Sequence, residues 1–167
     1  MDTASARVRD ILDALQSVST RPLVLREVPI RDGEAVSGYA DLVSERAYTY
    51  KPGEASDLVP LPESESPRYQ EARQTMLESL ADFDDTLLEQ LLEDIVPSKE
   101  EIYQHLTKDF QEDSIVPVFL GAAEHCHGVR RLLKALRHEV AESPSTVERL
   151  DLPAGDPLLE VFKTYHL

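Results

Sequence analysis

The spacing of hydrophobic residues changes several times along the chain, and each change predicts a different kind of element. Near the N-terminus, apolar residues recur at the helical spacing of i, i+3, i+4 and i+7, as Val8, Ile11, Leu12 and Leu15. This spacing predicts a helix over residues 3 to 18, with Thr3 or Ser5 as its N-terminal cap. Proline at position 22 is expected to end it, because the residue before a proline disfavours helical geometry.

The segment from residue 23 to residue 61 has the composition of strands. Residues 23 to 30 mix apolar and charged positions, which predicts an edge-like strand with an irregularity near Glu27. Residues 35 to 50 alternate in part and are rich in β-favouring residues, so they predict a β-hairpin or two strands. Pro60 confines the last short strand to the edge of a sheet.

Three helices are predicted to follow, each with its own start signal. Ser66-Pro67 is a hydroxyl cap followed by a proline at the first helical position. Asp84 or Asp85 can cap the second helix, and Ser98-Lys99-Glu100-Glu101 is a capping box that opens the third.

The first of these three helices has a distinct acidic side. Glu71, Glu78 and Asp82 fall seven and four positions apart, so they stack on one face of the helix, opposite its apolar residues. From the residues alone, the simplest interpretation of this stripe is an ordinary solvated surface.

Residues 114 to 142 have the pattern of a βα unit. The apolar run from 115 to 120 does not alternate, which predicts a strand covered on both faces. Gly121-Ala122-Ala123 ends it with small residues that allow close approach of a backbone or a flat ligand. An amphipathic helix is predicted after Gly128, with the exposed basic residues Arg130, Arg131, Lys134 and Arg137 between its apolar positions.

The tail from Ser143 to Leu167 changes character. Its prolines and Gly155 predict a linker, followed by a strand over residues 158 to 165 that has no partner. A cut inside a longer protein would have this appearance.

Composition and charge restrict the class of protein. Hydrophobic residues make up 41% of the 167 positions and charged residues 29%, so the chain can bury a core and stay soluble. A net charge of −15 argues against wrapping nucleic acid over the whole surface, and favours a basic protein partner or simple solubility. Cys126 is the only cysteine, which excludes an internal disulfide and fits a reducing cytosol. No apolar stretch is long enough for a membrane span.

No complete active site is visible in the sequence. Three consecutive residues such as His125-Cys126-His127 cannot all point to one metal ion, and no second cluster of ligands accompanies them. Cys126 also lacks the triad context of a nucleophile. Neither a Walker A sequence nor Gly-x-Gly-x-x-Gly occurs. The residues alone predict a soluble mixed α/β chain without intrinsic catalysis.

Several motifs nevertheless occur in a familiar order. They are Ser37-Gly38-Tyr39-Ala40-Asp41-Leu42-Val43, the helical segment from Met76 to Asp82, and Pro117 to Val129 with its small turn. In this order they resemble the elongation factor G family of ribosomal translocation GTPases, and from Met76 to Val129 the family pattern fits without a gap. The resemblance covers nearly the whole chain.

The resemblance implies the fold and its divisions. The fold class is α/β with a mixed α+β insert, part of a P-loop GTPase G domain that carries the G′ subdomain. Residues 1–22 would be a G-domain helix, 23–113 the G′ subdomain, 114–142 the last G-domain strand and helix, and 143–167 the linker and first strand of domain II.

The resemblance also implies part of a guanine-binding rim. Met1-Asp2 matches the end of the family's Asn-Lys-x-Asp motif, and Ala122-Ala123 occupies the Ser-Ala motif, with alanine in place of serine. Asp2, Ala122 and Ala123 are therefore the predicted cofactor-binding residues, and the altered motif suggests a divergent paralogue. The P-loop and switches are expected upstream, so GTP or GDP with Mg²⁺ belongs to the parent GTP hydrolase. The chain alone is predicted neither to hold GTP tightly nor to hydrolyse it, so no cofactor is expected in it.

The acidic stripe gains a role from the resemblance, because the matching family helix faces the basic C-terminal domain of the ribosomal stalk protein. Glu71, Glu78 and Asp82 are thus the predicted partner-binding residues. The implied function is ribosomal translocation in protein synthesis, in the cytoplasm, with neither DNA nor a membrane as partner. Two alternatives stay open: a related release or rescue GTPase, and a stand-alone acidic interaction module. Self-association through an exposed strand edge is also expected.

Overall fold

The computed structural model describes residues 7–33, 35–51 and 53–153. Its first element, helix α1 (Val8–Gln16), begins later than the sequence predicted. Arg7 precedes it without a side-chain cap, and the predicted caps Thr3 and Ser5 lie outside the described residues.

The strands form two separate sheets. β1 (Leu23–Leu25) pairs in parallel with β6 (Val116–Val118), whereas β2 (Glu27–Asp32), β3 (Ala35–Asp41), β4 (Arg46–Thr49) and β5 (Asp57–Val59) form an antiparallel sheet in chain order. The predicted hairpin and the final edge strand are confirmed.

Arg26 explains the irregularity predicted near Glu27. Its backbone N–H donates to the Val118 carbonyl at 3.0 Å, and its carbonyl accepts from Leu42 N–H at 3.0 Å. Arg26 thus lies between β1 and β2 and links the two sheets, and what the sequence suggested as one strand is two strands with different partners. β1 lies in the predicted segment 23–113, but its partner β6 lies in the predicted segment 114–142. The division of the chain into domains stays a prediction.

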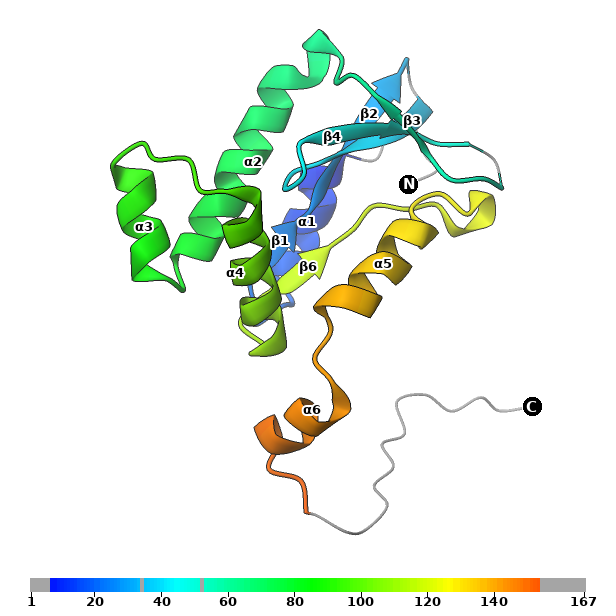
Figure 1. Cartoon of the computed structure of the whole chain (residues 1–167). Coiled ribbons are helices and arrows are strands. Elements are labelled where there is room, and N and C mark those ends of the chain that lie inside the picture. The colour runs from blue at the N-terminus through cyan, green and yellow to red at the C-terminus, as the bar shows by residue number, and fades with distance from the viewer. Residues whose placement is uncertain (1–6, 34, 52, 154–167) are drawn as a thin grey trace, which may run out of the picture.

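Three helices pack on one side of the sheets, at the left of Figure 1. They are α2 (Ser66–Ala81), which continues from the short 3-10 helix η1 (Glu63–Glu65), α3 (Asp85–Leu92) and α4 (Lys99–Gln111). The core lies between them and the strands, with fully buried side chains from each layer: Val24, Leu42, Val43, Leu80, Leu87, Ile102, Leu106 and Ile115.

Two of the three predicted helix starts are confirmed. Asp84 accepts from the amides of Thr86 and Leu87, and Ser98 with Glu101 completes the capping box. The prediction that Ser66 caps the first of these helices is wrong, because Ser66 is already helical. It follows η1 directly, Glu65 precedes the helix, and no side chain caps α2.

The βα unit is present, but its surroundings differ from the prediction. β6 leads through the short 3-10 helix η2 (Ala123–His125) into α5 (Val129–Glu139). Val116 is 38% exposed, so β6 is not covered on both faces by the described residues. The apolar stripe of α5 is also exposed, with Leu133 at 59% and Leu136 at 49%.

The predicted linker is partly helical. Ser143–Arg149 forms α6, with Pro144 in its first turn, and Figure 1 shows it projecting from the body below α5. The predicted strand over residues 158 to 165 lies outside the described residues. Within the described ranges, no helix has the length and apolarity needed to cross a lipid bilayer.

Candidate functional site

The loop after β6 closes on itself by backbone hydrogen bonds. Ala122 N–H donates to the His127 carbonyl at 3.1 Å, and His127 N–H donates back to the Ala122 carbonyl at 3.0 Å. Gly128 has a φ of +75°, and a Cβ there would lie 2.2 Å from the Leu120 carbonyl oxygen. A glycine is therefore required for the chain to return so closely to the end of β6.

This closed loop holds two of the three predicted guanine-rim residues. Ala122 is half-buried and Ala123 exposed, at the start of η2, which no side chain caps. The Ala122 N–H already donates to the His127 carbonyl, so of these two amides the one at Ala123, at the uncapped start of η2, is available for a hydrogen bond to a ligand. Asp2 lies outside the described residues, so its position relative to Ala122 and Ala123 stays a prediction.

The His-Cys-His segment lies in the same loop. Cys126 is exposed and has a φ of 56°, and the His127 ring stacks on Tyr50 with centroids 4.4 Å apart and planes 3° apart. Among the described residues, no group of three histidine, cysteine or acidic side chains is placed to hold a metal ion.

A network of buried charges lies behind this loop, and the sequence did not reveal it. Arg26, with a fully buried side chain, forms an ion pair with Glu139 of α5, with Nη1 2.5 Å from Oε2. Arg131, predicted to be exposed, instead donates from Nε and Nη2 to Asp41 Oδ2 at 3.1 and 2.9 Å. Its side chain is only 11% exposed, which corrects the prediction for this residue.

The Phe119 ring lies close to both guanidinium groups. Its ring centroid is 5.3 Å from the Arg26 Cζ and 4.9 Å from the Arg131 Cζ, within the range of cation–π attraction. The network therefore fixes the end of β6, where the loop begins, against α5 and the antiparallel sheet.

The pKa values of two carboxyl groups reflect this environment. Burial would raise the pKa of Asp41, but the charge of Arg131 and hydrogen bonds from Ser44 outweigh it, so the pKa is lowered and Asp41 stays ionised. Burial dominates at Glu27 and raises its pKa from 4.5 to about 7, although Glu27 Oε1 accepts from Leu120 N–H at 2.6 Å. Glu27 thus connects the antiparallel sheet to the residue before the Gly121 turn.

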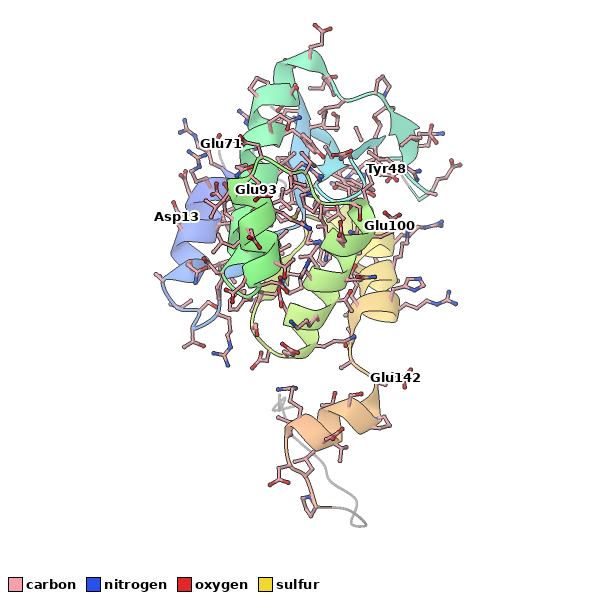
Figure 2. All side chains as sticks on the ribbon, turned by 60° about the vertical axis from the view of Figure 1, so that its left-hand side comes forward. Asp13, Tyr48, Glu71, Glu93, Glu100 and Glu142 are labelled. Atoms are coloured by element: carbon pink, nitrogen blue, oxygen red, sulfur yellow. The ribbon has the colours of Figure 1, made fainter. Side chains whose placement is uncertain are left out.

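The acidic residues of α2 lie on the surface, as their spacing predicted. We call Glu71, Glu78 and Asp82 the acidic face; all three are exposed, whereas Tyr69, Met76 and Leu80 on the other side of the helix are buried. Glu71 Oε1 lies 2.7 Å from Arg9 Nη2 of α1, in a pair exposed to solvent. Figure 2 shows Glu71 on the outer side of α2.

The helix that carries the acidic face is fixed to the antiparallel sheet. Arg73, 6% exposed, donates to the Leu42 carbonyl and lies 3.0 Å from Glu45 Oε1. Lys99 of α4 contacts the same β3–β4 turn, through the Ser44 carbonyl at 2.9 Å and Glu45 at 3.1 Å. These contacts hold the orientation of α2 relative to the sheet.

A larger solved protein contains a similar fold. The chain is similar to a crystal structure from Thermus thermophilus, with a TM-score of 0.72 and 26% identity over 87% of this chain and 21% of that one. No family model matches the chain. The fold is thus that of a mixed α/β segment of a larger protein of this type.

Curated relatives specify the family. The chain is 45% identical over 168 residues to an elongation factor G-like protein of Synechocystis, and 32% identical over 163 residues to elongation factor G 2 of Syntrophomonas wolfei. These matches cover 99% and 93% of this chain but 25% and 23% of the relatives. The chain belongs to the elongation factor G family, which confirms the resemblance, and it spans about a quarter of the length of those relatives.

Proposed function

We propose that this chain is the part of a translational GTPase that presents the acidic face of α2 to a basic ribosomal partner, the C-terminal domain of the stalk protein. The observation that carries the proposal is the exposure of Glu71, Glu78 and Asp82 along one side of a helix whose other side is buried. The parent would act in translocation, with a release or rescue role as the alternative within the same family.

Electrostatic attraction is the main contribution we assign to the acidic face. Single exposed ion pairs stabilise a complex weakly, but a cluster of like charges on an acidic chain of net charge −15 speeds association with a basic partner. Arg9 already pairs with Glu71. We therefore expect Glu78 and Asp82 to contribute more of the attraction than Glu71 does.

Charge reversal of the acidic face tests the proposal. Glu78→Lys with Asp82→Lys should weaken binding to the isolated stalk C-terminal domain at least tenfold and flatten its salt dependence, measured by calorimetry at two ionic strengths. Glu112→Lys is the matched control, an exposed acid at the end of α4. Equal affinities for all three proteins would reject the docking role and favour the stand-alone module.

We further propose that nucleotide chemistry belongs to the parent protein. Ala122 and Ala123 would form part of the rim around guanine there, whereas the phosphates and Mg²⁺ would be held by a P-loop that the sequence of this chain does not contain. A fluorescent GTP analogue should therefore show no micromolar affinity for this chain. Micromolar binding would contradict this assignment.

Self-association is a second proposal for the isolated chain. Among the described strands, β1 and β6 each pair with only one neighbour, and Val116 of β6 is 38% exposed. An unpaired strand edge can pair with another copy. Sedimentation should show a concentration-dependent dimer that Val116→Lys reduces, and a monomer at all concentrations would reject this proposal.

A further inference from the structure

A cleft of about 740 Å³ lies between the antiparallel sheet and helices α4 and α5, and the acidic face forms no part of its wall. In Figure 2, Tyr48 and Glu100 mark its side of the molecule and lie across the view from Glu71. Its lining differs from the rest of the chain, because basic and aromatic side chains gather there in a protein whose net charge is −15. Six lysine and arginine residues line it against four acidic ones, and two of these acids, Asp41 and Glu139, are already paired with arginines.

Two regular rows of side chains contribute to the lining. Arg46, Tyr48 and Tyr50 alternate along β4 and the residue after it, so they point to one face of the sheet. Arg130, Lys134 and His138 recur every four residues on α5, so they share one face of that helix. The strand row spans about 13 Å and the helix row about 12 Å, from the rise per residue of each element.

The basic residues of these rows are available to a ligand. Among the described residues, none of Arg46, Arg130 and Lys134 has an acidic side chain within 4.0 Å, and all three are exposed. Arg131 and Lys99, which also line the cleft, are already paired with Asp41 and Glu45.

The aromatic residues are held as fixed surfaces. Tyr48 is half-buried, and the ring of its cross-strand neighbour Tyr39, which also lines the cleft, stacks on it with centroids 5.1 Å apart and planes 21° apart. Tyr50 stacks on His127 in the same way. Rings that are supported by a stacked neighbour keep their orientation, and they can stack further planar groups without a large loss of side-chain entropy.

We propose that this cleft binds a short stretch of single-stranded RNA. Unpaired cations along a groove neutralise phosphates, and neighbouring aromatic rings stack bases, which is the combination that single-strand binding uses. A length of 12 to 13 Å corresponds to about three or four nucleotides at a spacing of about 3.4 Å. An acidic peptide would be attracted by the same cations but would gain little from the supported tyrosine rings, so the rings favour RNA.

The negative charge of the whole chain limits the binding to this groove. A protein of net charge −15 repels a long polyanion elsewhere on its surface, so only the local cation row can hold the strand. The affinity should fall steeply with salt, because each phosphate contact releases condensed counterions. The inference does not depend on stalk docking.

The test uses the full chain and a fluorescein-labelled octauridylate, followed by anisotropy at 50 and 200 mM salt. We expect binding that Arg130→Glu with Lys134→Glu weakens at least tenfold, with a smaller salt slope. Arg137→Glu is the matched control, since Arg137 is exposed on α5 but does not line the cleft. Tyr48→Ala should weaken binding at least fivefold, and Tyr48→Phe, which keeps the ring, should stay within twofold of the original.

Three results would overturn the inference. They are no binding of octauridylate at 50 mM salt, a loss with Arg137→Glu as large as with the cleft variants, and displacement of the RNA by octaglutamate at equal concentration. The last would assign the cleft to an acidic peptide. Binding of the stalk domain by the Arg130→Glu and Lys134→Glu protein should be unchanged, so failure of this inference is distinguishable from failure of the proposed docking role.

Discussion

Asp41 at the end of β3 and Arg131 in the first turn of α5 are 90 positions apart, yet Arg131 Nη2 lies 2.9 Å from Asp41 Oδ2 in a nearly dry site. The pair connects the antiparallel sheet to the helix that follows the Ala122-Ala123 loop. Asp41 Oδ1 also accepts from the amides of Val43 and Ser44, so both carboxylate oxygens have hydrogen-bond donors.

Removing one partner of this pair should be costly. Arg131→Met leaves the Asp41 carboxylate buried without its cation, and we expect a loss of about 3 to 5 kcal/mol in the free energy of unfolding by urea. Arg130→Met is the control, since Arg130 is exposed, and it should change stability by less than about 0.5 kcal/mol. Similar values for both variants would show that the buried pair is unimportant.

Glu27 should give stability an unusual pH dependence. Its pKa is raised from 4.5 to about 7 by burial, so the folded chain holds this proton more tightly than the unfolded chain. The contribution of protonated Glu27 to the free energy of unfolding is complete below pH 4.5. It is lost as the pH rises through 7, and the loss is at most about 3 kcal/mol.

The variant Glu27→Gln isolates this effect. Glutamine keeps an oxygen that can accept from Leu120 N–H but cannot ionise, so at pH 8 the variant should be at least as stable as the original chain. Urea unfolding from pH 4.5 to pH 8 should show a smaller loss in the variant. An identical pH profile for both proteins would contradict the assignment.

Two glycines with positive φ allow a matched test of the loop. Gly128→Ala would place a Cβ 2.2 Å from the Leu120 carbonyl oxygen, whereas Gly33→Ala, with a φ of +61°, would meet nothing within 4 Å. Gly33→Ala should cost about 1 to 2 kcal/mol from backbone strain alone. Gly128→Ala should cost clearly more in thermal unfolding, and equal costs would mean that the loop relaxes freely.

Two serines near helix starts should respond differently to alanine. Ser98 accepts from Glu101 N–H in the capping box, so Ser98→Ala should cost about 1 kcal/mol. Ser66 caps nothing, because η1 continues into α2, so Ser66→Ala should be nearly neutral. Chemical denaturation of both variants checks this. A larger loss in the free energy of unfolding for Ser66→Ala than for Ser98→Ala would indicate that Ser66 does cap α2.

Local sequence signals predicted many of the helices and strands, but they could not predict which distant residues pair with one another. The hairpin, the Asp84 cap and the capping box depend on residues within a few positions of each other. The switch of sheets at Arg26 depends on Val118 and Leu42, and nothing in the local pattern identifies these partners.

The same limit explains the error at α5. An amphipathic pattern shows which side of a helix is apolar, but not what covers it. In the described chain the apolar stripe is exposed, and one of the intervening basic residues, Arg131, is largely buried against Asp41, with its side chain 11% exposed. A carboxylate 90 positions away determines that burial, and helical spacing carries no information about it.

Docking of a basic ribosomal partner by the acidic face of α2 is the role that we propose for this chain. An ¹⁵N NMR titration of the full chain with the isolated stalk C-terminal domain tests it most directly. We predict that the amide signals around Glu71, Glu78 and Asp82 shift in a saturable manner, while those of α5 stay in place. Unchanged α2 signals at saturating partner, or shifts confined to other elements, would contradict the account.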